Sequence, residues 1–140
     1  MPLIERGELP LVEYGGMNEV HLKELELLNS LYDSIGSASD EEIDALFEAL
    51  FEDIKEHFAY EEDLMRKSHF FAYECHSQEH KRVLKELEEV RKRWLESRDR
   101  KELKRYFNRV FKPWIVDHIL TMDTVTAQWL SRVLSTLASK

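Results

Sequence analysis

The fold is decided by residues 43–65, IDALFEALFEDIKEHFAYEEDLM, in which apolar side chains recur at intervals of three and four residues. This interval is the period of an amphipathic helix. The apolar positions are Ile43, Leu46, Phe47, Leu50, Phe51, Ile54, Phe58, Leu64 and Met65. His57 and Glu61 lie four residues apart in the same stretch, so a helix points both side chains in one direction.

Three further helical patterns flank this stretch, at about residues 18–35, 72–96 and 101 into the 130s. Ser39 followed by Glu42 resembles a capping box that opens the second helix. Pro113 lies inside the fourth pattern, where it predicts a kink or a short break near Phe111. Residues 1–16 predict an irregular arm. We therefore expect an all-α, up-down-up-down four-helix bundle over residues 17–137, within a single domain of residues 1–140.

The composition fits one folded domain, because 43% of the 140 residues are hydrophobic and 34% are charged. The formal net charge is −8, which argues against a nucleic-acid partner. A single cysteine, Cys75, excludes an internal disulfide framework. Neither a secretory signal pattern nor an apolar stretch of about 20 residues is present, so we expect a cytoplasmic protein without a membrane partner.

The spacing of the histidines places several of them on common helix faces. His76 and His80 are four residues apart in HSQEH and share one face of the third helix. His118 and Asp123 are five apart in the fourth helix, which places them roughly 140° from one another in an ideal helix. A local distortion would bring Asp123 to the same side as His118. His21 stands alone near the start of the first helix.

An up-down-up-down topology brings these side chains to one end of the bundle. The set comprises His21, His57, Glu61, His76, His80, His118 and Asp123. Buried polar groups need partners, and a metal satisfies all seven. Imidazole and carboxylate suit iron, zinc, copper or manganese, and seven ligands with two carboxylates predict a centre of two ions. Each pair alone would be an ordinary surface pattern; the convergence favours metal. His69 is interpreted as a turn residue, and Cys75 is not expected to be a ligand.

The sequence resembles the hemerythrins, in particular the bacterial single-domain form. The resemblance covers about residues 17–128 and rests on HLKELELLNSLYD (21–33), HFAYEEDLM (57–65), HSQEHKRVL (76–84) and WIVDHILTMD (114–123). It implies a centre of two iron ions, bridged by an oxo or hydroxo group. In the assignment that it implies, one iron is bound by His76, His80 and His118, the other by His21 and His57, and both by Glu61 and Asp123.

The resemblance also implies that dioxygen binds at an open position on the iron with two histidines. The expected apolar wall of that oxygen pocket consists of Phe58, Trp114, Ile115 and Ile119. Glu24 departs from the family pattern, which usually has leucine three residues after the first histidine. Glu24 would either bind the open position as an extra ligand, or face solvent while Leu25 fills the pocket.

The favoured function is therefore a non-haem diiron protein that binds oxygen for storage, delivery or sensing, without catalytic residues. The alternative is a diiron redox enzyme, such as a peroxidase or a nitric oxide or oxygen reductase, with Glu24 modifying the open site. Peroxide and nitric oxide are then further candidate ligands. A third reading is iron storage or a purely structural bundle. The oligomeric state does not follow from these features.

Overall fold

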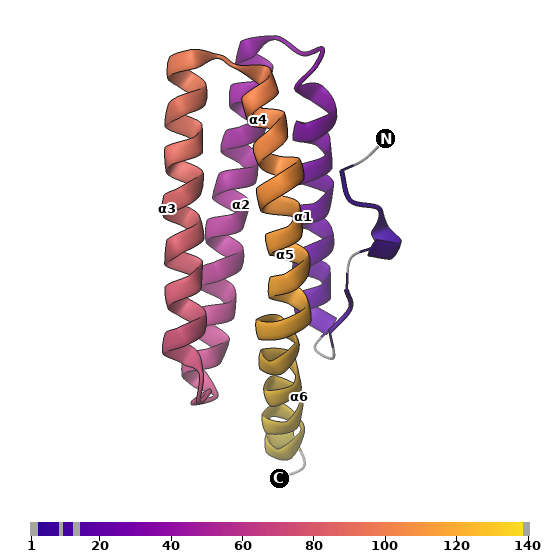
Figure 1. Cartoon of the computed structure of the whole chain (residues 1–140). Helices are drawn as coiled ribbons and strands as arrows, with labels where there is room; N and C mark the ends of the chain where they lie inside the picture. Colours follow the sequence, from indigo (N-terminus) through magenta and orange to yellow (C-terminus); the bar gives the residue numbers. More distant parts are fainter. Residues whose placement is uncertain (1–2, 9, 13–14, 139–140) are drawn as a thin grey trace.

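A computed structural model describes residues 3–8, 10–12 and 15–138, and this part of the chain contains helices and no strand (Figure 1). The first three bundle helices are α1 (Gly15–Ser34), α2 (Asp40–Lys67) and α3 (Tyr73–Ser97). The fourth is continuous and consists of α4 (Arg100–Tyr106), η2 (Phe107–Phe111), α5 (Lys112–His118), η3 (Ile119–Asp123) and α6 (Thr124–Ala138). The expected four-helix bundle is confirmed. Within the described ranges, no helix has the length and hydropathy that crossing a membrane requires.

Local signals in the sequence set the helix ends. The Ser39 hydroxyl accepts a hydrogen bond of 3.2 Å from the backbone N–H of Glu42, as the capping pattern predicts. Asp99 caps α4 in the same way, at 3.1 Å from the N–H of Glu102. His69 and Arg98 take up left-handed backbone, with φ of 55° and 52°, in the two turns that follow α2 and α3. These turns reverse the chain and bring the helix ends together.

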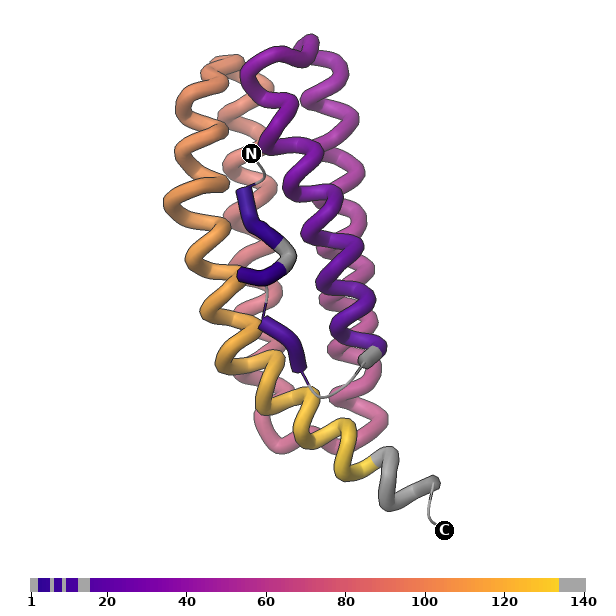
Figure 2. The backbone as a smooth tube through the Cα atoms, turned by 90° about the vertical axis from the view of Figure 1, so that its right-hand side faces the viewer, coloured from indigo at the N-terminus to yellow at the C-terminus, as the bar shows by residue number. Residues whose placement is uncertain are grey.

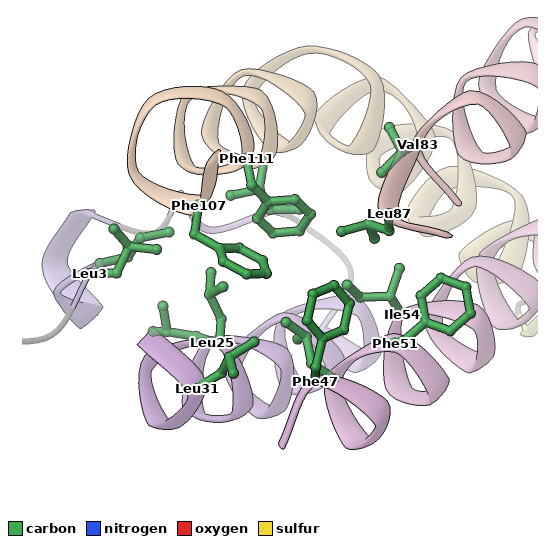
Figure 3. Close-up of a cluster of buried hydrophobic side chains, with 14 of the residues drawn as sticks. Leu3, Leu25, Leu31, Phe47, Phe51, Ile54, Val83, Leu87, Phe107 and Phe111 are labelled. Carbon is green, nitrogen blue, oxygen red and sulfur yellow. The ribbon is translucent and has the colours of Figure 1, made fainter. Parts of the chain in front are cut away.

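An apolar layer fills the bundle at the end far from the histidines (Figure 3). Phe107 lies between Phe47 and Phe111, with ring centroids 5.7 and 5.8 Å away in edge-to-face contact. All three rings are at most 1% exposed. Each buried phenylalanine contributes about 1.5–3 kcal/mol to folding. This layer holds the four helices in register, so that the polar residues three turns further along meet at fixed positions.

The fourth bundle helix contains two π-helical turns, one before Pro113 and one before Thr124. The N–H of Lys112 donates to the carbonyl of Phe107, and that of Thr124 donates to the carbonyl of Ile119, both five residues back. Proline has no N–H to donate, and the first widened turn ends immediately ahead of it. The helix therefore accommodates Pro113 without breaking near Phe111.

The N-terminal arm lies along the bundle, across α1 and the fourth helix (Figure 2). The Asn29 side chain pairs with the backbone of Ile4: its Oδ1 accepts from the N–H at 3.1 Å and its Nδ2 donates to the carbonyl at 2.9 Å. Asn18 makes the same pair with Val12, at 2.9 and 2.7 Å. Ile4 and Val12 are buried. Apart from the short 3₁₀ turn η1 (Arg6–Glu8), the described part of the arm is irregular, as expected, and it packs onto the bundle.

Candidate metal centre

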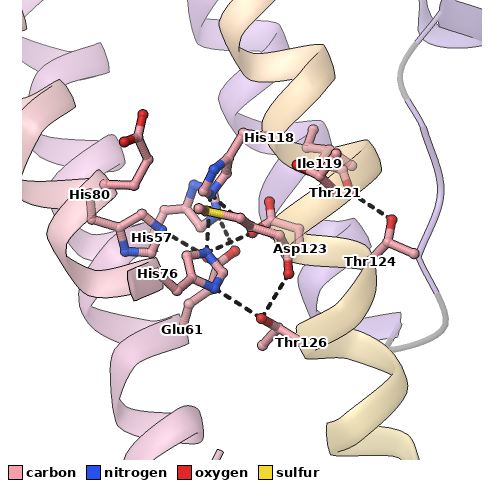
Figure 4. Close-up of polar contacts among 12 residues, drawn as sticks. His57, Glu61, His76, His80, His118, Ile119, Thr121, Asp123, Thr124 and Thr126 are labelled. Carbon is pink, nitrogen blue, oxygen red and sulfur yellow. Dashed lines mark hydrogen bonds and ion pairs between the residues drawn. The ribbon is translucent and has the colours of Figure 1, made fainter. Parts of the chain in front are cut away.

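The seven residues singled out by their spacing meet in one buried layer, with side chains from all four bundle helices. Figure 4 labels all of them except His21. None is more than 3% exposed. They are His21 on α1, His57 and Glu61 on α2, His76 and His80 on α3, and His118 and Asp123 on the fourth helix. The convergence expected from topology and spacing is thus present in the structure.

The donor atoms fall into two overlapping groups, each with all its atoms within 4.8 Å of one another. The first group contains Glu61, His76, His80, His118 and Asp123. The second contains His21, His57, Glu61 and Asp123. Both carboxylates belong to both groups. The cluster therefore has a three-histidine side and a two-histidine side, joined by the carboxylates.

The two oxygens of Glu61 divide between these sides. Oε1 lies 3.4 Å from Nε2 of His76 and 3.3 Å from Nε2 of His80. Oε2 lies 2.5 Å from Nε2 of His57 and 3.5 Å from Nε2 of His21. A carboxylate with one oxygen towards each of two donor groups has the orientation needed to bridge two cations.

Asp123 divides its oxygens in the same way. Oδ1 lies 3.1 Å from Nε2 of His76 and 3.2 Å from Nε2 of His118, whereas Oδ2 lies 3.1 Å from Nε2 of His21. The π turn Ile119–Asp123 explains how the aspartate reaches this place. A turn closed five residues back brings side chains at that spacing onto one face. The spacing of His118 and Asp123 had predicted such a distortion.

Threonine hydroxyls accompany the widened turn. Thr124 donates to the carbonyl of Ile119 at 2.6 Å, and Thr121 donates to the carbonyl of Asp117 at 2.8 Å. Hydroxyls that bond to carbonyls in the preceding turn bend helices and compete with the regular backbone ladder. These two bonds lie at the start and the end of the π turn and add to its backbone hydrogen bonds.

Three of the five imidazoles make a further hydrogen-bonding contact through Nδ1, the ring nitrogen that faces away from the cluster. His57 contacts Glu24, His76 lies 2.9 Å from Oγ1 of Thr126, and His80 lies 3.2 Å from Oε2 of Glu62. Such contacts fix the ring orientation and leave Nε2 directed at the cluster. Sequence analysis missed Glu62 and Thr126, because a partner from another helix has no spacing signal.

Charges in the layer balance one another. Burial disfavours the imidazolium form of His21 and His76, but the adjacent carboxylates of Asp123 and Glu61 outweigh it and raise the pKa of each to about 9. For His57 as well, burial is outweighed, here by the Glu61 and Glu24 carboxylates, so its pKa is raised well above the usual value. Burial acts against ionisation of Glu61 too, yet the surrounding imidazoles hold its pKa well below the usual value. Without a metal, protons on the imidazoles therefore neutralise the carboxylates.

Several buried atoms of the cluster still lack a hydrogen-bond partner among the described residues. They are both ring nitrogens of His21, Nε2 of His80, Oε1 of Glu61 and both oxygens of Asp123. Buried polar atoms without partners are rare and costly. Cations would satisfy most of these atoms at once, and imidazole with carboxylate is a suitable donor set for iron, zinc, copper or manganese. The residues present thus fit a metal centre.

The structure divides the expected oxygen-pocket wall into two parts. Phe58 stacks on His80, with centroids 3.9 Å apart and planes 3° from parallel. Trp114 stacks on His118 at 4.6 Å and 19°. These two rings cover the three-histidine side. Ile115 and Ile119 instead line a small cavity beside His21, on the two-histidine side.

The structure places Glu24 away from solvent, against one of the two alternatives considered from the sequence, and outside both donor groups. Its side chain is buried, with the residue 3% exposed, so it does not face solvent. Its Oε2 contacts Nδ1 of His57, the outer nitrogen of that ring, and Glu24 belongs to neither donor group. Leu25 lies beside it and lines the same cavity. Cys75, on the exposed side of α3, is not part of the cluster.

Together, the four-helix architecture and the buried layer define a helical bundle with a histidine and carboxylate cluster that can hold metal. Residues 14–130 match the family described as hemerythrin HHE cation binding domain. The chain belongs to the hemerythrin family.

Two similar proteins are bacteriohemerythrins. The one from Aquifex aeolicus (strain VF5) is 39% identical over 114 residues, which cover 81% of this chain and 87% of that protein. The one from Methylococcus capsulatus is 24% identical over 117 residues, covering 84% and 88%. A crystal structure of a mutant hemerythrin superposes with a TM-score of 0.80, at 22% identity, over 94% of this chain and 99% of that one. This likeness agrees with the fold.

Proposed function

We propose that this protein binds dioxygen at a non-haem centre of two iron ions, and that it serves oxygen storage, delivery or sensing. The observation that carries the proposal is the division of both carboxylates between a three-histidine and a two-histidine group. A single ion would be held by one donor group, so two overlapping groups indicate two ions. Membership of the hemerythrin family and the similarity to bacteriohemerythrins support iron over the other metals that these donors accept.

In this proposal, His76, His80 and His118 hold one iron, and His21 and His57 hold the other. Glu61 and Asp123 would hold both irons, since each carboxylate belongs to both donor groups. The two-histidine group offers one protein donor fewer, so an iron held there would have room for a small ligand. The iron pair supplies this ligand position and the electrons that dioxygen binding requires.

The chain itself orients the donors and excludes water. The contacts of His57, His76 and His80 with Glu24, Thr126 and Glu62 hold the rings with Nε2 towards the centre. Phe58 and Trp114 cover His80 and His118 with aromatic faces. The cavity on the open side is lined mainly by aliphatic side chains. Exclusion of water from such a site slows loss of the bound state to oxidation.

The test is an optical spectrum of the iron-loaded protein, reduced without air and then exposed to it, with iron assayed on the same sample. We expect two irons per chain and a visible band that appears with oxygen and disappears under vacuum. Direct conversion to an oxidised spectrum with no reversible species would refute oxygen binding.

A matched pair of variants compares a cluster histidine with a histidine outside the cluster. His118→Ala removes a donor and should lower iron content and abolish the band. His69→Ala changes a turn residue outside both donor groups and should leave both unchanged. Equal effects of the two variants would contradict the assignment of the centre.

One observation favours a second candidate, a diiron redox enzyme such as a peroxidase or a nitric oxide or oxygen reductase. Glu24 places a buried carboxylate beside the two-histidine side. An acidic group there could serve proton-coupled reduction of a bound substrate. Sustained consumption of peroxide, nitric oxide or oxygen with an external reductant would favour this candidate over reversible binding.

A further inference from the structure

A small cavity lies against His21, between α1, the fourth helix and the N-terminal arm. Its volume of about 10 Å³ is room for one molecule the size of water. The lining residues are Ile4, His21, Glu24, Leu25, Leu28, Ile115 and Ile119, and each of them is buried. The cavity is therefore an apolar space with two polar side chains in its wall, one a cluster histidine and the other Glu24.

Glu24 brings a carboxylate oxygen to this cavity that the protein does not pair. Oε2 is used in the contact with His57, whereas Oε1 is buried and has no hydrogen-bond partner among the described residues. An unpaired buried carboxylate oxygen costs folding free energy, so its presence calls for an explanation. Five of the other lining side chains are aliphatic, so little else in the cavity wall offsets the charge of the Glu24 carboxylate.

Glu24 stands outside the cluster of donor atoms in this structure. It contacts the outer nitrogen of His57, and neither donor group contains it. Lys23, its neighbour in sequence, pairs with Asp53 at 3.3 Å and does not line the cavity. The side chain of Glu24, with its unpaired oxygen, thus borders any small molecule that enters beside His21.

We propose that Glu24 makes the cavity beside His21 select small neutral ligands and reject small anions. The inference rests on the proposed function, since it places the ligand at the two-histidine side. A carboxylate in an apolar cavity repels an anion strongly because little solvent screens the two charges. An uncharged diatomic molecule is not repelled. An uncharged ligand with an O–H group gains a hydrogen bond by donating to Oε1.

The experiment compares azide, a small anion, with nitric oxide, a neutral diatomic molecule. The iron-loaded full chain is prepared as wild type, Glu24→Gln and Asp53→Asn, and iron content is measured for each. Azide affinity is titrated on the oxidised protein and nitric oxide affinity on the reduced protein, both by optical spectra. Asp53→Asn is the control, since it removes the same charge from a buried carboxylate outside the cavity.

In Glu24→Gln, the amide oxygen can still accept from His57 while the negative charge is lost. We expect azide to bind at least about tenfold more tightly than in wild type, with nitric oxide affinity within about twofold. Asp53→Asn should change neither affinity by more than about twofold. Glu24→Leu, of similar size, repeats the test without a polar group and should also strengthen azide binding.

Azide affinity unchanged in both Glu24 variants, with nitric oxide still bound, would overturn the selectivity while leaving the diiron proposal standing. An equal gain in Asp53→Asn would also overturn it, because the effect would then come from net charge and not from the cavity. Failure of every variant to hold two irons or to bind nitric oxide would instead reject the proposed function.

Discussion

Asn29→Ala should release the part of the N-terminal arm that closes the cavity beside His21. The half-buried Asn29 side chain makes two hydrogen bonds with the backbone of Ile4, at 3.1 and 2.9 Å. Ile4 is 1% exposed and lines the cavity. Alanine keeps the helix and removes both bonds. The substitution therefore acts on arm docking and spares the donor atoms of the cluster.

The expected magnitude follows from these two bonds. A hydrogen bond between neutral groups contributes about 0.5–1.5 kcal/mol net, so the pair contributes about 2 kcal/mol. This loss raises the equilibrium constant for arm opening by a factor of about 30. Packing of Ile4 and Leu3 against the bundle remains and limits the opening.

Hydrogen exchange of the arm amides, followed by mass spectrometry, measures this equilibrium directly. Asn29→Ala should speed exchange over residues 3–8 by roughly the same factor of about 30. In the iron-loaded protein, loss of the oxygenated form to oxidation should also become faster, because water reaches the cavity when Ile4 leaves it.

Asn18→Ala is the matched control. Asn18 holds Val12 by the same pair of bonds, at 2.9 and 2.7 Å, but Val12 does not line the cavity. Its loss should speed exchange near Val12 without affecting the cavity. If Asn29→Ala left exchange over residues 3–8 unchanged, or if both variants oxidised equally fast, the reasoning that the Ile4 contact closes the cavity would be wrong.

Three further outcomes are expected. Metal-free protein should lose unfolding free energy as pH rises from about 6.5 to 9. Folding raises the pKa of His21 and His76 from about 6.5 in the unfolded chain to about 9, so their stabilising effect is complete below pH 6.5 and is lost as pH approaches 9. Denaturant titrations at a series of pH values check this. Apparent affinity for Co²⁺ should rise over the same window, because the metal displaces those protons. Trp114→Phe should cost about 1 kcal/mol of unfolding free energy, from the lost 2.9 Å bond to Glu79, with iron content unchanged.

The layer of seven polar residues was predictable because it depends only on helix geometry and short connections. Spacings of four place His57 with Glu61, and His76 with His80, on single faces. Antiparallel neighbours then bring the faces to one level. The spacing of five between His118 and Asp123 conflicts with an ideal helix, and that conflict itself predicted the distorted turn.

The contacts of Glu24 were not predictable in the same way. The sequence shows that Glu24 shares a face with His21, but its partner is His57, on a different helix. A contact across helices depends on rotation and side-chain rotamers, which spacing does not determine. The docking of the arm was not predicted either: Asn18 and Asn29 lie about three helical turns apart on one stripe of α1, but their spacing does not reveal that they bind the backbone of Val12 and Ile4.

The two sides of the cluster differ in their surroundings as well as in their number of histidines. Aromatic rings lie flat on His80 and His118, which leaves no room for a ligand against those faces. On the other side, His21 borders a cavity with an unpaired carboxylate oxygen and an aliphatic wall. The side with fewer protein donors is thus also the side with space. Both features favour entry of a small ligand at the same position, beside His21 and Glu24, which is where the proposed selectivity places it.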